Sequence, residues 1–353
     1  MSLPETSRSV TYLLPIKAAS PPTDELTDYL RRIAAICPVI VVDGSDGSTF
    51  DAAHRAWASF AHHVPPAAEH QCLNGKVHGV LTGLDLVETQ AVVVADDDVR
   101  YEPEVLAACV AALDDADLVR PQNYFDPLPW HARWDTARTL LNRALGADFP
   151  GTLVVRAEAL RAAGGYDGDV LFENLEMMRS IAAAGGRCVS RPDLYVRRIP
   201  PHTRHFVGQR VRQAYDEFAR PHRLVLSMMV VPGVAALAVR ANWRALVAGA
   251  TASVLLAEVG RARCAGRRRF PFTSSLLAPA WILERGVCSW LAVGRRLTGG
   301  VPYAGGKLVR AANPTRALRR DRTTIRQSRP SQLSTGTRSA AAAVASEALL
   351  VAS

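Results

Sequence analysis

The sequence predicts an α/β fold with a mostly parallel sheet, followed by an α-helical C-terminal region that is associated with a membrane. Two short β-branched runs, residues 39–42 and 92–95, end abruptly in carboxylates. Buried parallel strands have this composition, and open α/β sheets bind their ligands at the carboxyl ends of such strands. A helix-like segment precedes each run, and two uncharged apolar stretches begin at residues 224 and 245.

The distribution of charge along the chain limits the classes of function that the protein can have. The chain of 353 residues is 48% apolar and has a formal net charge of +9. Acidic pairs and triplets precede residue 200 and most basic clusters follow it, which favours a metal- and nucleotide-binding half followed by a half that faces an anionic partner. An anionic membrane surface fits that partner better than nucleic acid, because the basic stretches flank apolar segments and lack interleaved aromatic residues.

The cysteines and the first residues indicate a compartment. Six cysteines without a C-x-x-C pair argue against a zinc site or a disulfide framework, and they are typical of a reducing environment. Residues 1–10 are polar and contain no apolar core of a secretory signal. We therefore expect the N-terminal half to lie on the cytoplasmic face of the cell membrane.

The first 49 residues read as a nucleotide-binding unit. Residues 10–16 form a strand that ends near Pro15, residues 23–36 a helix with one apolar face, and residues 39–42 a second strand. The loop that follows begins at Asp43, whose carboxylate can accept hydrogen bonds from a nucleobase or a ribose. An Asx turn that caps a helix explains Asp43 equally well. The lack of G-x-G-x-x-G argues against a dinucleotide cofactor.

The next segment runs from Asn74-Gly75-Lys76 into a helix over residues 77–87, and Lys76 can reach a phosphate. The strand at residues 92–95 then leads into three consecutive carboxylates. Asp96 and Asp98 point to the same side of extended backbone, so one Mg²⁺ or Mn²⁺ ion can bridge them. We expect Asp97 to point back towards the sheet or its neighbouring loop. A solvated acidic turn is the alternative interpretation.

The following segments alternate between helix and strand. We expect a helix to residue 113, strands at 118–122 and 151–156, and a short helix at 157–163 that stops at Gly164-Gly165. Trp130 and Trp134, set among basic residues, suit either a sugar- or phosphate-bearing acceptor or the packed face of an amphipathic helix. Glu173 and Glu176 open a further helix, where they serve either the helix dipole or as a general base.

Beyond residue 205 the character of the chain changes. A charged helix at 206–220 contains Gln209 and Arg212, and two apolar runs follow at 224–239 and 245–257. These runs are short for bilayer spans, and they suit short spans, a re-entrant hairpin, surface helices or a buried core hairpin. An arginine cluster at 261–269 and an amphipathic stretch at 274–297 come next. We divide the chain into residues 1–205, 206–310 and a disordered tail, 311–353.

Taken together, these residues resemble a family 2 glycosyltransferase with a GT-A fold. The similar motifs are Val41-Val42-Asp43-Gly44, Asn74-Gly75-Lys76-Val77 with Leu81-Thr82-Gly83-Leu84, Asp96-Asp97-Asp98, Gly164-Gly165-Tyr166, Glu173-Asn174-Leu175-Glu176 and Gln209-Arg210-Val211-Arg212-Gln213. The last motif and the apolar tail are similar to the ceramide glucosyltransferase-like, membrane-associated branch. Asn174 stands where the family has Asp, and Gln213 stands where it has Trp. The second departure argues against processive polymer synthesis.

The resemblance implies inverting, metal-dependent transfer from a nucleotide-diphosphate sugar, with a UDP-sugar expected, to a lipid or other membrane-associated hydroxyl. It implies Asp43 for the nucleoside, Lys76 and Asp96 for the donor, and Asp96 with Asp98 for Mg²⁺ or Mn²⁺. Glu173, with Glu176 in reserve, is the implied base. The pyrophosphate or acceptor residues are Gln209, Arg212, Trp130 and Trp134. A catalytically inactive membrane scaffold and a sugar-nucleotidyltransferase are the alternatives, and Asn174 favours the first of these.

Overall fold

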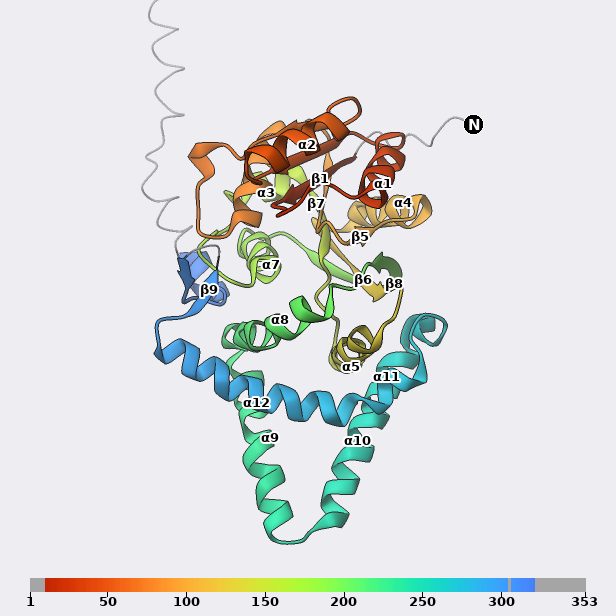
Figure 1. The fold of residues 1–353 in the computed structure, drawn as a ribbon, viewed down its shortest axis with the longest axis vertical. Helices are drawn as coiled ribbons and strands as arrows, with labels where there is room; N and C mark the ends of the chain where they lie inside the picture. Colours follow the sequence, from red (N-terminus) through yellow and green to blue (C-terminus); the bar gives the residue numbers. More distant parts are fainter. Residues whose placement is uncertain (1–9, 304–305, 321–353) are drawn as a thin grey trace, which may run out of the picture.

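The computed structural model describes residues 10–303 and 306–320. Its centre is an eight-stranded sheet with helices on both faces, and a group of long helices lies at one end (Figure 1). The strand order is β3-β2-β1-β4-β7-β6-β8-β5. The strands are β1 (Val10–Ile16), β2 (Val39–Asp43), β3 (His62–Val64), β4 (Ala91–Ala95), β5 (Val99–Arg100), β6 (Leu118–Phe125), β7 (Thr152–Arg156) and β8 (Cys188–Arg198).

The half of the sheet formed by the first four strands is parallel. Strands β1, β2, β3 and β4 pair in parallel, whereas β7 runs antiparallel to both β4 and β6. Nearly every residue of β1, β2 and β4 is buried, as continuous apolar runs covered on both faces require. The carboxyl ends of β2 and β4 therefore bring Asp43 and the acidic triplet to the same edge.

The helices around this sheet are α1 (Asp24–Ala34), α2 (Gly47–Trp57), α3 (Gly75–Leu86), α4 (Pro103–Ala111), α6 (Ala157–Ala162) and α7 (Glu173–Ala183). Helix α3 begins two residues before the predicted start, because the Asn74 side chain caps it by accepting a hydrogen bond from the Lys76 amide. Helix α2 was not predicted, and it begins directly after the loop that follows Asp43.

Strand β8 is the largest departure from the predicted elements. Its segment contains Pro192, Asp193 and several arginines, so it lacks the alternation of a half-buried strand. Its pairing with β6 carries an irregularity between Pro121 and Gln122, and β5 pairs with its other edge. The long-range pairing rather than local preference forms this strand.

The helices at the far end of the molecule are α5 (Trp130–Leu145), α8 (Thr203–Tyr215), α9 (Pro221–Val239), α10 (Trp243–Ala262), α11 (Phe272–Leu276) and α12 (Ala278–Leu297). Figure 1 shows α9 and α10 as a hairpin that projects away from the sheet, with α12 crossing its base. The segments Pro221–Val239 and Trp243–Arg268 are long and apolar enough to cross a membrane, and only 6% and 17% of their apolar windows are buried. The interpretation of the two apolar runs as a buried core hairpin is therefore wrong.

The arginine cluster at 261–269 is partly structural. Arg261 pairs with Glu258, Arg263 donates to the carbonyl oxygens of residues 143 and 144, and the Arg269 guanidinium lies over the Tyr124 ring. Arg267 and Arg268 are exposed. These two remain available to an anionic surface.

The described part of the tail is not disordered, and this corrects the boundary at residue 311. After the β9 (Val301–Tyr303) and β10 (Gly306–Leu308) hairpin, Arg310 bridges Val170, and Ala311 and Ala312 are buried. Helical turns follow up to residue 320. Residues 321–353 of the predicted disordered tail lie outside the described residues.

Candidate active site

The carboxyl edge of the sheet opens into a cavity of about 350 Å³. Its lining includes eight of the residues that the sequence singles out, together with three further polar residues that the sequence does not single out. The first group is Lys76, Asp96, Asp98, Glu173, Asn174, Gln209, Arg212 and Gln213, and the second is Arg198, Asp216 and Tyr303. Strand ends, the first turn of α7, helix α8 and the β9–β10 hairpin thus converge on one space.

Alternating charges hold the centre of the cavity together. The Lys76 Nζ lies 2.6 Å from Asp96 Oδ1 and 2.9 Å from Glu173 Oε1. Arg198 lies on the other side, with Nη2 3.3 Å from Asp96 Oδ2 and Nε 2.8 Å from Asp98 Oδ2. Burial raises the pKa of Asp96, but attraction to Lys76 and Arg198 outweighs this and lowers it below its ordinary value.

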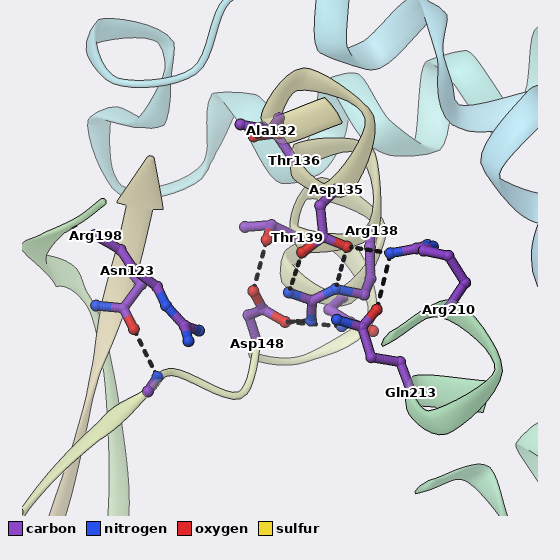
Figure 2. A network of polar contacts seen from close by, with 12 residues as sticks. Asn123, Ala132, Asp135, Thr136, Arg138, Thr139, Asp148, Arg198, Arg210 and Gln213 are labelled. Atoms are coloured by element: carbon purple, nitrogen blue, oxygen red, sulfur yellow. Dashed lines mark hydrogen bonds and ion pairs between the residues drawn. The ribbon is translucent and has the colours of Figure 1, made fainter. Parts of the chain in front are cut away.

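Gly151 permits this close packing. A Cβ atom at Gly151 would collide with the Asp96 carboxylate and crowd the Arg198 guanidinium. The Gly151 amide donates a 2.7 Å hydrogen bond to Asn123 Oδ1, which fixes the backbone at this point (Figure 2). A residue with no side chain is therefore required beside Asp96.

Asp98 is the least satisfied carboxylate of the triplet. Its buried Oδ1 has no hydrogen-bond partner among the described residues. Burial is the main cause that raises the pKa of Asp98 to about 6; Arg198 opposes the rise and Asp96 adds to it. Asp97 is exposed and lines a neighbouring pocket with Asp98, so of the two predicted orientations the one towards the sheet is wrong.

The donor atoms fit a divalent cation that takes most of its ligands from a phosphate-bearing molecule. Asp96 and Asp98 supply carboxylate oxygens, including the unpartnered Oδ1 of Asp98. No group of three or more His, Cys, Asp or Glu residues suited to a metal occurs within the described ranges. Mg²⁺ is commonly held in this way, by one or two carboxylates, substrate phosphates and water. Any ion here shares its carboxylates with Lys76 and Arg198.

Asp43 lies under a second pocket, of about 310 Å³, that Asp97 and Asp98 also line. Asp43 Oδ1 accepts from the Ser45 amide at 2.8 Å, and Oδ2 lies 3.1 Å from His63 Nε2. Burial raises the pKa of Asp43, but the hydrogen bonds from His63 and Ser45 outweigh it and lower the pKa. Asp98 borders both this pocket and the larger cavity, so it stands at their junction.

The two candidate bases, Glu173 and Glu176, lie in different places. Glu173 lines the cavity, and Asn174 beside it donates to the Pro150 carbonyl at 3.1 Å. Glu176 is 0% exposed, and its oxygens accept from the Asn313 amide and Nδ2 at 2.7 and 2.8 Å. Glu176 therefore ties the chain after β10 to helix α7 and does not reach the cavity, against the expectation of a reserve base.

The tryptophan candidates also lie elsewhere. Trp130 is 58% exposed, and Trp134 Nε1 donates to Glu284 Oε2 at 2.7 Å while its ring packs against a cluster between α5 and the C-terminal helices. Neither lines the cavity. Trp134 therefore lies on the packed face of an amphipathic helix, as the second interpretation expects, whereas Trp130 is largely exposed.

A network under the cavity positions α8. Figure 2 shows Arg138 between Asp135 and Asp148, and Arg210 reaching Asp135 and Gln213. Burial raises the pKa of Asp135, but attraction to Arg138 and Arg210 outweighs it and holds the pKa far below its ordinary value. Gln213, at the position of the family's Trp, is thus held by Arg210 at the cavity wall.

Three cavity residues were missed because of where they lie in the chain. Arg198 ends the unpredicted strand β8, Asp216 follows α8, and Tyr303 belongs to the β9–β10 hairpin, where its hydroxyl donates to Asn74 Oδ1 at 3.0 Å. The buried carboxylates Asp96 and Asp98 signal that a second cation is needed near Lys76. Nothing in the local sequence singles out Tyr303.

A family model described as "Glycosyltransferase like family 2" matches residues 25–216, more than half of the chain. The chain belongs to glycosyltransferase family 2. The matched residues include Asp43, the acidic triplet, Glu173 and the α8 motif. The sheet of this family 2 glycosyltransferase has the mostly parallel GT-A arrangement. A comparison with curated protein sequences gives no significant match.

Solved glycosyltransferase structures are similar to this chain. The mannosyltransferase PcManGT from Pyrobaculum calidifontis, in complex with GDP-Man and Mn²⁺, is 20% identical, with 80% of this chain and 87% of that chain covered and a TM-score of 0.47. Mannosyl-3-phosphoglycerate synthase from Rubrobacter xylanophilus is 17% identical, with 57% and 70% covered and a TM-score of 0.39. TarS from S. aureus, in complex with UDP-GlcNAc, is 15% identical, with 56% and 60% covered and a TM-score of 0.40.

Proposed function

We propose that this family 2 glycosyltransferase transfers a sugar, with inversion, from a nucleotide-diphosphate donor to a lipid or other membrane-associated acceptor on the cytoplasmic face of the cell membrane. The observation that carries the proposal is the position of Asp98 at the junction of the Asp43 pocket and the larger cavity. A donor that spans this junction has its nucleoside beside Asp43 and its diphosphate beside Asp96 and Asp98.

Each residue then has a physical task. Asp96 and Asp98 would hold a Mg²⁺ or Mn²⁺ ion, which would offset the charge that develops on the nucleotide diphosphate as it leaves. Lys76 holds Asp96 and Glu173 at hydrogen-bond distance and so aligns the two carboxylates. Glu173 accepts the proton of the acceptor hydroxyl as that oxygen attacks the anomeric carbon. Arg212 and Gln209 face the cavity from α8 and bind the pyrophosphate or the acceptor.

The metal and donor assignments are tested by the Asp98→Ala variant. We expect wild-type protein to be stabilised against heat by a UDP- or GDP-sugar together with Mn²⁺, and we expect Asp98→Ala to lose this shift. Loss of one metal-binding carboxylate should lower donor turnover by a hundredfold or more. Unchanged metal-dependent nucleotide binding in Asp98→Ala would refute the metal site.

The base assignment is tested by a pair of neutral substitutions. Glu173→Gln should lower kcat about a hundredfold or more and leave donor binding unchanged, because general base catalysis is worth 10²–10⁴. Glu176→Gln is the matched control on the same helix: it weakens the hydrogen bonds to Asn313 and should lower thermal stability more than kcat. If Glu176→Gln removes turnover in folded protein and Glu173→Gln does not, the base is wrongly assigned.

Asn174, which stands where the family has Asp, favours a second candidate function, a scaffold without catalytic activity. Its amide donates to a backbone carbonyl and cannot accept a proton at neutral pH. A transferase-derived membrane scaffold would bind nucleotide sugars with Mn²⁺ yet turn over none of them. Donor hydrolysis or transfer by the wild-type protein across a panel of UDP- and GDP-sugars excludes that alternative.

A further inference from the structure

Two further cavities continue from the active site towards the projecting hairpin. The first, of about 150 Å³, shares Phe149, Asp216 and Arg198 with the active-site cavity. Its far wall consists of Arg220, Arg223 and Arg285, and we call it the arginine chamber. These three residues also line the second cavity, a groove of about 550 Å³ where α12 crosses the base of α9 and α10 (Figure 1). The three spaces therefore share walls in series.

The arginine chamber has buried hydrogen-bond donors that lack acceptors. Arg285 is 3% exposed, and its Nε and Nη1 have no partner among the described residues. The Nε of Arg220 and the Nε1 of Trp281 are likewise buried without a partner. Buried polar groups in folded proteins are nearly always hydrogen-bonded, so a set of unpartnered donors around one chamber calls for an acceptor that binds there.

The chamber also has an excess of positive charge. Glu217 is shared by Arg220, at 3.4 Å, and by Arg223, at 3.6 Å, and Arg285 forms no ion pair within 4.0 Å in the part of the chain that the structure describes. Burial lowers the pKa of Arg220 to about 10, with repulsion from Arg223 adding to the effect against attraction to Glu217. Burial lowers the pKa of Arg285 as well. A bound anion would relieve this unfavourable electrostatics.

Arg138 and Arg198 show how partly buried arginines in the same region are paired. Arg138 lies between Asp135 and Asp148, and Arg198 between Asp96 and Asp98. The chamber arginines have no such set of carboxylates. Arginines with free donors and no carboxylate partner are the groups that proteins use to bind phosphate.

The groove beyond the chamber suits a hydrocarbon chain. Its walls include Leu141 from α5, Leu226 and Val230 from α9, Leu256 from α10 and Ile282 from α12, and it contains no acidic residue. Leu226 is 69% exposed, so the groove is continuous with the apolar surface of the hairpin. An apolar chain that leaves the arginine chamber through this groove reaches the part of the molecule that is suited to a membrane.

We propose that the acceptor of this enzyme is an anionic lipid in which a phosphate or diphosphate joins a hydrocarbon chain. The phosphate binds Arg220, Arg223 and Arg285, the chain lies in the groove, and a free hydroxyl on the other side of the phosphate faces Asp216 and the active-site cavity. The oxygen of that hydroxyl forms the new bond to the anomeric carbon, its proton passes to Glu173, and the nucleotide diphosphate leaves. This assignment rests on the proposed transferase function, because it names the class of acceptor that the same site takes.

The test uses full-length protein in a neutral detergent and decyl phosphate below its micelle concentration. We expect decyl phosphate to bind at least tenfold more tightly than inorganic phosphate or decanol. Arg285→Met should weaken that binding at least tenfold without lowering the Tm of the free protein, since it removes a buried charge that has no partner. Arg295→Met, on an exposed position of the same helix, is the matched control and should bind normally.

The outcomes separate the acceptor site from the donor site. If Arg285→Met does not fold, Arg223→Gln, whose side chain is 30% exposed, takes its place and should show the same loss. Equal binding of inorganic and decyl phosphate would overturn the lipid assignment. If Arg285→Met or Arg223→Gln loses nucleotide-sugar binding but binds decyl phosphate normally, the chamber belongs to the donor site and the lipid assignment is refuted. If the wild-type protein binds decyl phosphate but binds no nucleotide sugar, the lipid site stands and the proposed transfer is refuted.

Discussion

Asp216 lies where the active-site cavity meets the arginine chamber, and burial there opposes its charge. Burial raises the pKa of Asp216 to about 7; Arg212 opposes the rise and Glu173 adds to it. An aspartate in an unfolded chain titrates near pH 4. The folded protein therefore holds this proton more tightly than the unfolded chain does.

This difference makes stability depend on pH in a defined direction. Below about pH 4 Asp216 is protonated in both states, and between about pH 4 and 7 the folded state loses stability as the pH rises. We expect the free energy of unfolding of the wild type to fall relative to that of Asp216→Asn by a few kcal/mol across this interval. Urea unfolding of both proteins at pH 4.5 and 7.5 measures it, and parallel pH profiles would contradict the shifted pKa.

Some residues of the site could be predicted from the sequence around them, and others could not. Asp96, Asp98 and Asp43 follow apolar strands directly, so their meeting at one edge could be predicted from strand order alone. Glu173 and Glu176 open the same helix, and sequence spacing could not tell which one turns towards the cavity. The fold decided it, because Asn313 takes both oxygens of Glu176. Tyr303 could not be predicted, since it arrives through a hairpin more than two hundred residues from its partner, Asn74.

At the scale of elements, the helices and central strands follow from local pattern, and the peripheral strand β8 does not. Buried β-branched runs and capped amphipathic helices have preferences that agree with their tertiary contacts. The β8 segment has no such preference and becomes a strand because β6 and β5 offer hydrogen-bonding edges. Strand β8 places Arg198 beside the carboxylates. Because the sequence did not predict this strand, it did not predict the position of Arg198 either.

The contact between α10 and α5 depends on a single small residue. A Cβ at Gly260 would collide with the backbone carbonyl of Leu140, which cannot move aside as a side chain can. Gly260→Ala should therefore destabilise the folded protein by about 1–3 kcal/mol despite the better helix propensity of alanine. A thermal shift assay in detergent measures the loss.

Gly249→Ala is the matched control on the same helix, because no heavy atom lies within 4 Å of the Cβ that it adds. It should leave the Tm unchanged or raise it, as alanine is favoured over glycine in a helix by about 1 kcal/mol. Equal effects of the two substitutions would show that α10 does not pack closely on α5.

At the scale of the whole molecule, the polar active site and the apolar hairpin lie at opposite ends of a connected path. The sheet presents its carboxylates to the cavity, the arginine chamber follows, and the groove leads to α9 and α10. Under the proposed function, this order would place a soluble nucleotide sugar and a lipid acceptor on two sides of the same reacting centre. It also explains why helices α9 and α10 expose apolar side chains that a soluble domain would bury.

The hairpin should hold the protein on the membrane by its exposed apolar tip. Val239, Trp243 and Val247 are 88%, 64% and 65% exposed, and burying a large apolar side chain is worth about 1.5 kcal/mol or more. Replacing all three with Ser should therefore lower membrane partitioning by a hundredfold or more, measured as the fraction of protein in the pellet after carbonate extraction. The control replaces Leu73, Val207 and Val309, which are exposed away from the hairpin, and should stay in the pellet. If high salt alone releases the wild type, arginines such as Arg267 and Arg268 rather than the hairpin supply the attachment, because salt screens charges and leaves apolar burial intact.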